Sequence, residues 1–275
     1  MKAKSLFFTF LCMLAFAISM NAQQTQTMPA PSVDKKTDAL LRGMSDLLSK
    51  SNSFTFHTKE MHDKVRPSGK IVQVSLTREV AVRRPDGVWM HALTKASDQS
   101  RELNLWYDGK TVTLQSNHEK VYARAKVPPN IDEALDYIGS TLNLPTPMGD
   151  VLYSSPYDSF MGPDTSGKYV KLTKIEGKSC HELAFKNPIL NWVMWIADGE
   201  TPLLCKLEIQ YKHDYGKPKI SMTFLDWNLN AQIAETQFTH VPPADFRRIK
   251  IIGRVPLEDS ATEQDSKTQT QTQEN

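Results

Sequence analysis

The stretch that most resembles a catalytic motif is GPDTSGKY, at residues 162–169. It nearly matches the phosphate-binding loop G-x-x-x-x-G-K-[ST], whose last hydroxyl binds magnesium. Tyr169 replaces that Ser or Thr. The alternating residues that follow predict a strand, whereas a phosphate loop opens a helix whose N-terminus helps to hold phosphate. We therefore interpret this stretch as a surface loop before a strand.

Other residue types that could do chemistry are not arranged to do it. Cys180 and His181 are a nucleophile next to a base, but neighbouring residues of a strand point to opposite faces and cannot form a dyad. The seven histidines show no zinc-ligand spacing, and His57 and His62 are five residues apart. No G-x-S-x-G nucleophile elbow occurs. The sequence predicts no enzyme, no cofactor and no metal site.

Composition also limits the partners. The formal net charge is only +2 over 275 residues, and no block of Lys and Arg stands out. Nucleic acid and anionic membrane are therefore not expected as main partners, since both require a basic surface. A hydrophobic content of 40% is enough for a globular domain.

The N-terminus has the pattern of a secretory signal peptide at residues 1–22. Lys2 and Lys4 form the positive region, residues 6–18 are apolar, and Ala22 is a suitable cleavage position. The alternative is a membrane anchor, which needs about 20 apolar residues and is therefore disfavoured. We expect export to the periplasm without stable insertion in a membrane.

The folded part is predicted to be a single domain at residues 34–253. Residues 23–33 are polar and contain prolines, as in a flexible leader, and residues 254–275 have almost nothing to bury, which predicts a disordered tail. Lipidation of Cys12 is rejected, because bulky Leu11 precedes it inside the apolar region.

Two amphipathic helices are expected in this domain. The first occupies residues 34–51, and its apolar residues recur at spacings of three and four. The second begins after Asn130, a good N-cap with Glu133 three residues later, as in a capping box. The two apolar stripes comprise Leu40, Leu41, Met44, Leu47 and Leu48 in the first helix, and Ile131, Leu135, Ile138 and Leu142 in the second.

The remainder predicts roughly ten antiparallel strands joined by short turns. In residues 70–83, one apolar face is formed by Val72, Val74, Leu76, Val80 and Val82. Residues 202–211 are expected to place Cys205 on the same face as Leu207, and residues 236–241 are expected to form the last strand. The fold class is therefore mainly β (α+β), with an antiparallel sheet whose apolar side is covered by the helices.

Cys180 and Cys205 are expected to remain unpaired. They lie on the first and third strands of a predicted meander, so the middle strand would separate them by roughly 9 to 10 Å. A disulfide needs Cα atoms within about 7 Å. A different strand order would reverse this prediction.

The order of elements resembles an uncharacterised family of predicted periplasmic proteins (domain of unknown function 2092) in the outer-membrane lipoprotein carrier-like superfamily. The similarity extends over roughly residues 34–252. The stretches that carry it are GKSCHELAF at 177–185, WIADG at 195–199, PL at 202–203, DWN at 226–228, and the end of the domain from Phe238 to the prolines at 242–243.

This resemblance implies a curved antiparallel sheet forming a half-open barrel, with the helices as a lid over a hydrophobic cavity. The implied function is a periplasmic binding or carrier protein for a lipid or a lipoprotein acyl chain. The alternative is a module that binds another envelope protein and has no small ligand. The candidate wall and lid residues are Leu40, Leu41, Met44, Val72, Val74, Leu76, Leu135 and Ile138.

Overall fold

The computed structural model describes residues 32–95, 100–144, 146 and 148–251. The predicted signal peptide and the predicted tail lie outside these residues. The last two residues of the predicted leader lie within them: Val33 forms a parallel bridge with Gly167, whose amide donates a hydrogen bond to the carbonyl of Ser32 (3.0 Å). The folded part of the chain therefore includes both of these residues.

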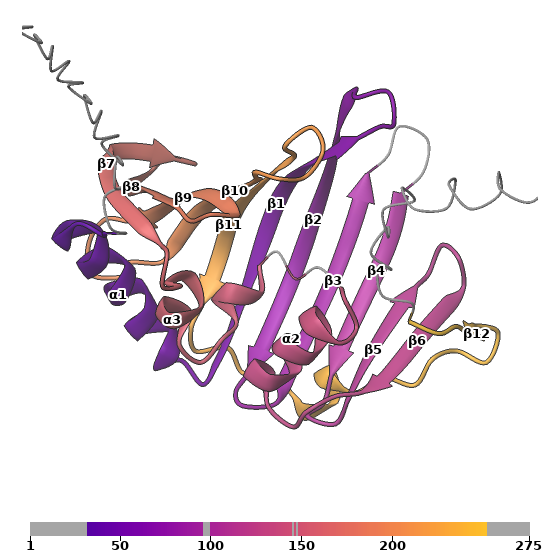
Figure 1. Cartoon of the computed structure of the whole chain (residues 1–275). Helices are drawn as coiled ribbons and strands as arrows, with labels where there is room; N and C mark the ends of the chain where they lie inside the picture. The colour runs from indigo at the N-terminus through magenta and orange to yellow at the C-terminus, as the bar shows by residue number, and fades with distance from the viewer. Residues whose placement is uncertain (1–31, 96–99, 145, 147, 252–275) are drawn as a thin grey trace, which may run out of the picture. The chain divides into compact units, whose positions relative to one another are not determined.

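Within the described residues, twelve strands form one sheet in the order β12-β6-β5-β4-β3-β2-β1-β11-β10-β9-β8-β7. The strands are β1 (Ser53–Val65), β2 (Ile71–Arg83), β3 (Gly87–Lys95), β4 (Ser100–Tyr107), β5 (Thr111–Ser116), β6 (Val121–Lys126), β7 (Ser166–Ile175), β8 (Lys178–Lys186), β9 (Leu190–Ala197), β10 (Leu204–Tyr211), β11 (Lys219–Asn228) and β12 (Arg247–Arg248). Neighbouring strands are antiparallel, except that β12 runs parallel to β6. The sheet is curved and open, which confirms the expected fold class (Figure 1).

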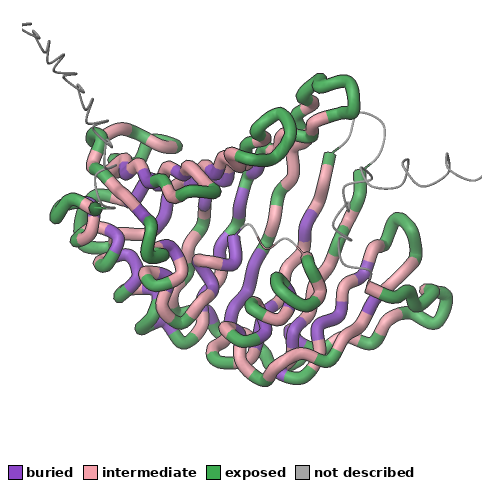
Figure 2. The backbone as a smooth tube through the Cα atoms, in the orientation of Figure 1, coloured by how far each residue is buried: buried purple, intermediate pink, exposed green. Residues whose placement is uncertain are grey.

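The helices lie over one face of the sheet, here called the inner face (Figure 1). They are α1 (Lys35–Ser49), α2 (Ile131–Ser140) and α3 (Pro156–Phe160), with 3-10 turns η1 (Gly149–Val151) and η2 (Glu235–Phe238). The opposite face is called the outer face. Along β1 the inner-facing residues are buried in alternation, first Phe54 and Phe56 and then the polar Thr58 and Glu60. Buried and exposed segments alternate along the strands of the sheet (Figure 2).

Helix α1 closes the core at the β7–β10 end of the sheet. It packs against β7, β9 and α3. Leu41, Met44 and Leu48 of the predicted stripe have no exposed surface, and they share one hydrophobic cluster with residues of β8, β9 and β10. This part of the interior is filled by the protein's own side chains.

Asp34 caps α1 and ties it to β7. Its carboxylate accepts hydrogen bonds from the Thr37 amide (2.8 Å), the Thr37 hydroxyl (3.0 Å) and the Tyr169 amide (2.6 Å). Burial raises the pKa of Asp34, but these hydrogen bonds outweigh it and hold that pKa below its ordinary value. The cap therefore stabilises the fold fully above the unfolded pKa of about 3.9 and is lost as the pH falls through the lower folded pKa.

Replacing Asp34 with alanine should lower the free energy of unfolding by about 0.5–2 kcal/mol at neutral pH, the usual range for a lost N-cap. Urea denaturation followed by circular dichroism measures this change. Asp34→Asn is the matched control, because its amide oxygen still accepts from Thr37, and it should lose less than the alanine variant. Equal losses in both variants would contradict the capping role.

The expected strand at 236–241 is wrong. This segment contains η2 followed by extended chain, and Phe238 is buried at 1% exposure. The Phe238 ring lies against Gly87, at 3.0 Å from the position that a Cβ atom there would take, and the Arg83 guanidinium stacks over it at 4.8 Å. The segment folds as a turn because its one large apolar side chain, that of Phe238, packs against Gly87 at the start of β3.

The expectation of two unpaired cysteines is also wrong, since Cys180 and Cys205 form a disulfide with a Cα–Cα distance of 6.9 Å. The strands β8, β9 and β10 do form the predicted meander. However, a bulge between Leu204 and Lys206 turns Cys205 to the outer face, away from Leu207 and next to Cys180. Ala197, the last residue of β9, stands opposite Cys180, and its small side chain packs against the cluster of Cys180, Trp195 and Cys205.

Candidate functional site

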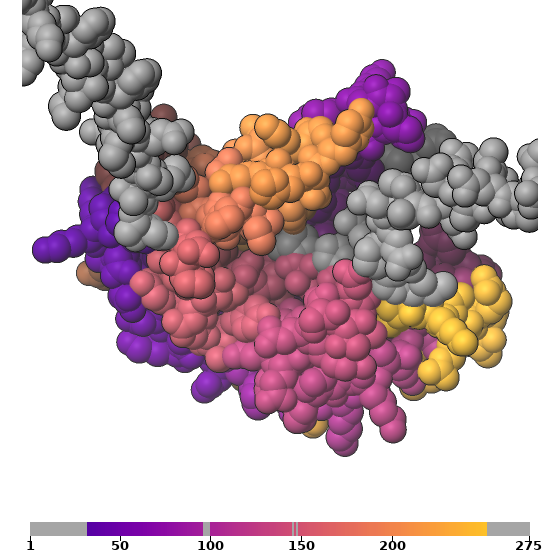
Figure 3. Space-filling view, viewed as in Figure 1, coloured from indigo at the N-terminus to yellow at the C-terminus, as the bar shows by residue number. Residues whose placement is uncertain are grey.

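An apolar pocket lies between α2 and the inner face of β2, β3 and β4. Its volume is about 120 Å³. Its walls include Val80, Met90 and Leu105 from the sheet and Ile131, Leu135 and Ile138 from α2. Strand pairing explains the sheet wall, because Val80 stands opposite Met90 and Met90 opposite Leu105, so all three share one face. Seen from the helix side, α2 and the segment around η1 cover this region (Figure 3).

The local sequence fixes how α2 lies over the pocket. The Asn130 side chain accepts from the Glu133 amide (2.9 Å), which confirms the predicted N-cap. The spacing of the apolar residues then turns Ile131, Ala134 and Ile138 inward, and all three are buried. The helix is therefore oriented by its stripe, and its polar residues face away from the sheet.

The hydrogen bonds that hold α2 to its neighbours lie in its first two turns. The Ile131 amide donates to the Pro85 carbonyl (2.8 Å), and Asp132 accepts from the Ser154 amide (2.8 Å). The Tyr153 hydroxyl donates to Asp136 (2.6 Å), and burial together with this bond raises the pKa of Tyr153, so the hydroxyl stays protonated. No described hydrogen bond joins the last turn, from Tyr137 to Ser140, to the sheet.

A charged cluster stands at the edge of the pocket. Arg78 lines the pocket, and its Nη1 donates to both carboxylate oxygens of Glu60 (2.7 and 2.8 Å) and to the Met148 sulfur (3.4 Å). Glu60 also accepts from the Thr58 hydroxyl (2.6 Å) and lies 2.7 Å from His62 Nε2. The Glu60 side chain is fully buried and that of Arg78 is 13% exposed, so the pair lies in a medium of low dielectric.

The structure brings together only part of the predicted site. Leu135 and Ile138 line the apolar pocket. Leu40 is half-buried at the rim of the main core, and Leu41 and Met44 are buried within it, away from the pocket. Val72, Val74 and Leu76 are half-buried along the first half of β2, as the burial pattern of that strand shows. A ligand-binding role for these residues of α1 and β2 stays a prediction.

Arg78 is the residue that sequence reasoning missed. Its position was visible as a gap, because the apolar face of β2 runs through Val74 and Leu76 and continues at Val80, with Arg78 between them. An arginine on an apolar face needs a partner when it is buried. That partner, Glu60, lies on the neighbouring strand at a place which depends on the pairing register of β1 and β2.

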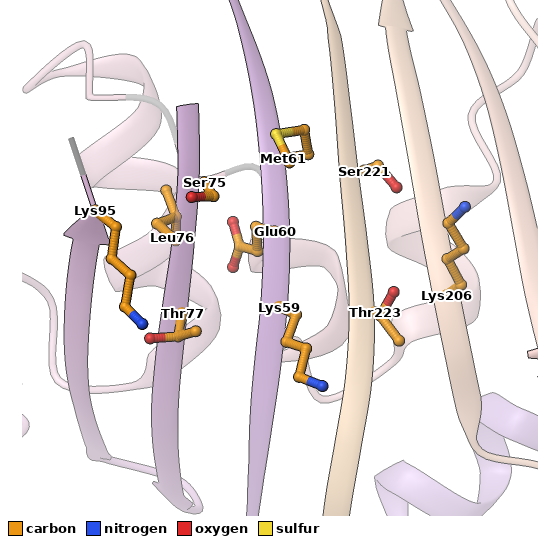
Figure 4. Close-up of a pocket in the computed structure, with 10 residues that line it drawn as sticks. All are labelled: Lys59, Glu60, Met61, Ser75, Leu76, Thr77, Lys95, Lys206, Ser221 and Thr223. Carbon is orange, nitrogen blue, oxygen red and sulfur yellow. The ribbon is translucent and has the colours of Figure 1, made fainter. Parts of the chain in front are cut away.

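A second, larger pocket of about 450 Å³ lies on the outer face (Figure 4). It crosses β3, β2, β1, β11 and β10 and is lined mainly by hydroxyl and ammonium groups. Lys206 is paired with Glu208 (2.6 Å), whereas Lys59 and Lys95 make no ion pair with any residue that the structure describes. Met61 and Leu76, the latter a residue of the predicted site, also line this pocket, so its wall combines apolar side chains with hydroxyl and ammonium groups.

Among the described residues, no group of three or more His, Cys, Asp or Glu side chains is placed to hold a metal ion. No helix in the described part of the chain is long and apolar enough to cross a membrane.

Comparison with known proteins identifies the family. A family model described as "predicted periplasmic protein (DUF2092)" matches residues 37–252, and no curated protein matches the sequence.

Similar solved structures include the lipoprotein LppX of Mycobacterium tuberculosis (14% identity, TM-score 0.44, covering 73% of this chain and 100% of that one). LprF of Mycobacterium bovis has 12% identity and a TM-score of 0.45, covering 74% and 98%. A LolA superfamily protein of Nitrosomonas europaea has 10% identity and a TM-score of 0.35, covering 74% and 97%. Since the family model spans well over half of the chain, this protein belongs to the DUF2092 family of predicted periplasmic proteins.

Proposed function

We propose that this protein is a periplasmic binding or carrier protein for a lipid or another ligand with an acyl chain. The ligand's hydrocarbon chain lies between α2 and the inner face of β2, β3 and β4. The observation that carries this proposal is the apolar pocket beneath α2. Burial of an apolar chain there is favourable by about 25 cal/mol per Å².

The size of the pocket sets a condition on this function. Pockets for drug-sized ligands have about 300–1,000 Å³, so about 120 Å³ accommodates only the end of a chain. The inner face continues the apolar wall beyond the pocket, where Ala92 and Leu103 face the same side and Leu103 is 41% exposed. Binding of a full chain therefore requires the last turn of α2 to move outward along this wall.

Filling the pocket tests this function directly. Ala134 is buried at 2% exposure and lines the pocket, so Ala134→Phe should place a ring in the space that the ligand needs. We expect the affinity for the apolar dye N-phenyl-1-naphthylamine, measured by fluorescence, to fall at least tenfold. This corresponds to about 1.4 kcal/mol of binding free energy.

Gly139→Phe is the matched control, since it adds the same ring to an exposed position of the same helix with nothing within 4 Å. It should leave dye binding unchanged. A wild-type protein that binds no dye, or equal binding by both variants, would rule out the pocket. If the native protein also carries no acyl species by mass spectrometry and captures an envelope protein instead, it is an interaction module.

A further inference from the structure

One edge of the Arg78 guanidinium has no partner among the residues that the structure describes. All hydrogen bonds of Arg78 to described residues come from Nη1, which contacts Glu60 and Met148. Nε is buried without a hydrogen bond, and Nη2 donates to no residue that the structure describes. Buried polar groups are paired in the large majority of native structures, so an unpaired one calls for an explanation.

The chemistry of this edge is specific. The Nε–H and Nη2–H bonds of a guanidinium are parallel and match the two oxygens of one carboxylate, which gives a bidentate, charge-assisted pair. Glu60 occupies Nη1 and is also held by Thr58 and His62, so it does not need this edge. Once the outward movement of α2 exposes the buried Nε, a carboxylate can therefore bind Arg78 without displacing Glu60.

The free edge belongs to a residue of the apolar pocket. Arg78 lies in the same cross-strand row as Ala92 and Leu103, next to the row that contains Val80 and Met90. A ligand with its chain beneath α2 thus has its polar end within reach of the guanidinium. The adjacent Glu60 favours a group with one negative charge, since a dianionic phosphate would be repelled more strongly.

We propose that Arg78 binds the carboxylate of a long-chain carboxylic acid whose hydrocarbon chain lies beneath α2. This inference rests on the proposed function and names the class of ligand that the pocket selects. The acid should bind better than a neutral compound of the same chain length, because only the acid fills the unpaired edge.

Competition with the apolar dye separates the two proposals. Dodecanoate, methyl dodecanoate and dodecyl phosphate are titrated against the full-length protein loaded with N-phenyl-1-naphthylamine. We expect dodecanoate to displace the dye at a concentration about tenfold or more below that of the ester, as for hydrogen bonds to a charged group. Equal displacement by acid and ester would overturn the role of Arg78 and leave the pocket intact. Stronger displacement by the phosphate would overturn the choice of a carboxylate, and no dye binding at all would overturn both proposals.

A substitution then assigns the preference to Arg78. Arg78→Lys keeps a positive charge beside Glu60 but removes the two parallel N–H donors of the guanidinium. The dye should still bind, while the ratio between the displacing concentrations of the ester and the acid falls to less than threefold. Arg83→Lys is the control, because Arg83 lies on the same strand, faces outward and pairs with Asp86 at the surface. This control should keep the ratio of about tenfold or more between the displacing concentrations of the ester and the acid. An unchanged preference in Arg78→Lys would refute the assignment, since that variant still binds dye and is therefore folded.

Discussion

Replacing Glu60 with alanine should lower the free energy of unfolding by about 3–5 kcal/mol, the range observed when one partner of a buried ion pair is removed. Glu60 is fully buried and accepts hydrogen bonds from Thr58 and Arg78, with His62 at 2.7 Å. Without its carboxylate, the Arg78 charge would remain beneath α2 with no counter-charge among these neighbours. Chemical denaturation monitored by tryptophan fluorescence measures the loss.

Glu79→Ala is the control for this prediction. Glu79 belongs to β2, as Arg78 does, but it is exposed on the outer face opposite His57 and His91. Its removal should change the free energy of unfolding by no more than about 0.5 kcal/mol. If Glu60→Ala loses less than about 1 kcal/mol, Arg78 must find another partner or water in the variant, and the cluster does not stabilise the fold as described.

Most of the fold follows from local patterns. The alternation of apolar residues in 70–83 identifies β2 as a strand with one apolar face, and the apolar spacing after Asp34 and Asn130 identifies α1 and α2. These signals are local, because each depends only on residues within one element. They do not report an inserted residue, so the bulge at Cys205 was missed and its side chain was assigned to the wrong face.

The site was predictable only in part, for a physical reason. Leu135 and Ile138 belong to a stripe, and a stripe on a helix implies that something apolar lies beneath it. Met44 belongs to an equally clear stripe, yet it packs into a filled core, because α1 lies over the large side chains of β8, β9 and β10. Whether a stripe meets a core or a cavity depends on the opposite wall, which is set by the sheet register and not by the helix.

The same register explains why β1 and β2 present different chemistry on their two faces. Glu60 and Arg78 belong to the charged cluster on the inner face. Lys59 and Thr77, next to them in sequence, line the pocket on the outer face (Figure 4). One strand pair thus separates an apolar pocket from a basic one by the thickness of a single sheet. A shift of one residue in this pairing would exchange the two sets of side chains.

Removing the disulfide by the double substitution Cys180→Ala and Cys205→Ala should lower the free energy of unfolding by about 3–4 kcal/mol. The bond closes a loop with a sequence separation of 25 residues, and the entropy of the unfolded chain rises by an amount of this order when such a loop is opened. The effect is large because the bond joins β8 to β10 across β9, so it links three neighbouring strands of the sheet, and α1 packs against the middle one. Guanidinium denaturation of the wild-type protein and the variant, each with and without a reductant, measures it.

The reductant supplies the internal control. It should destabilise the wild-type protein by a similar amount and leave the double variant unchanged, since packing effects of the alanines are present in both samples of the variant. Thiol titration gives a second and independent result. A chain that begins after the predicted cleavage position Ala22 has two cysteines, so the denatured, unreduced protein should show no reactive thiol, and two after reduction. Two thiols before reduction would mean that the bond does not form, and the packing of β8–β10 in the core would then hold these strands without it.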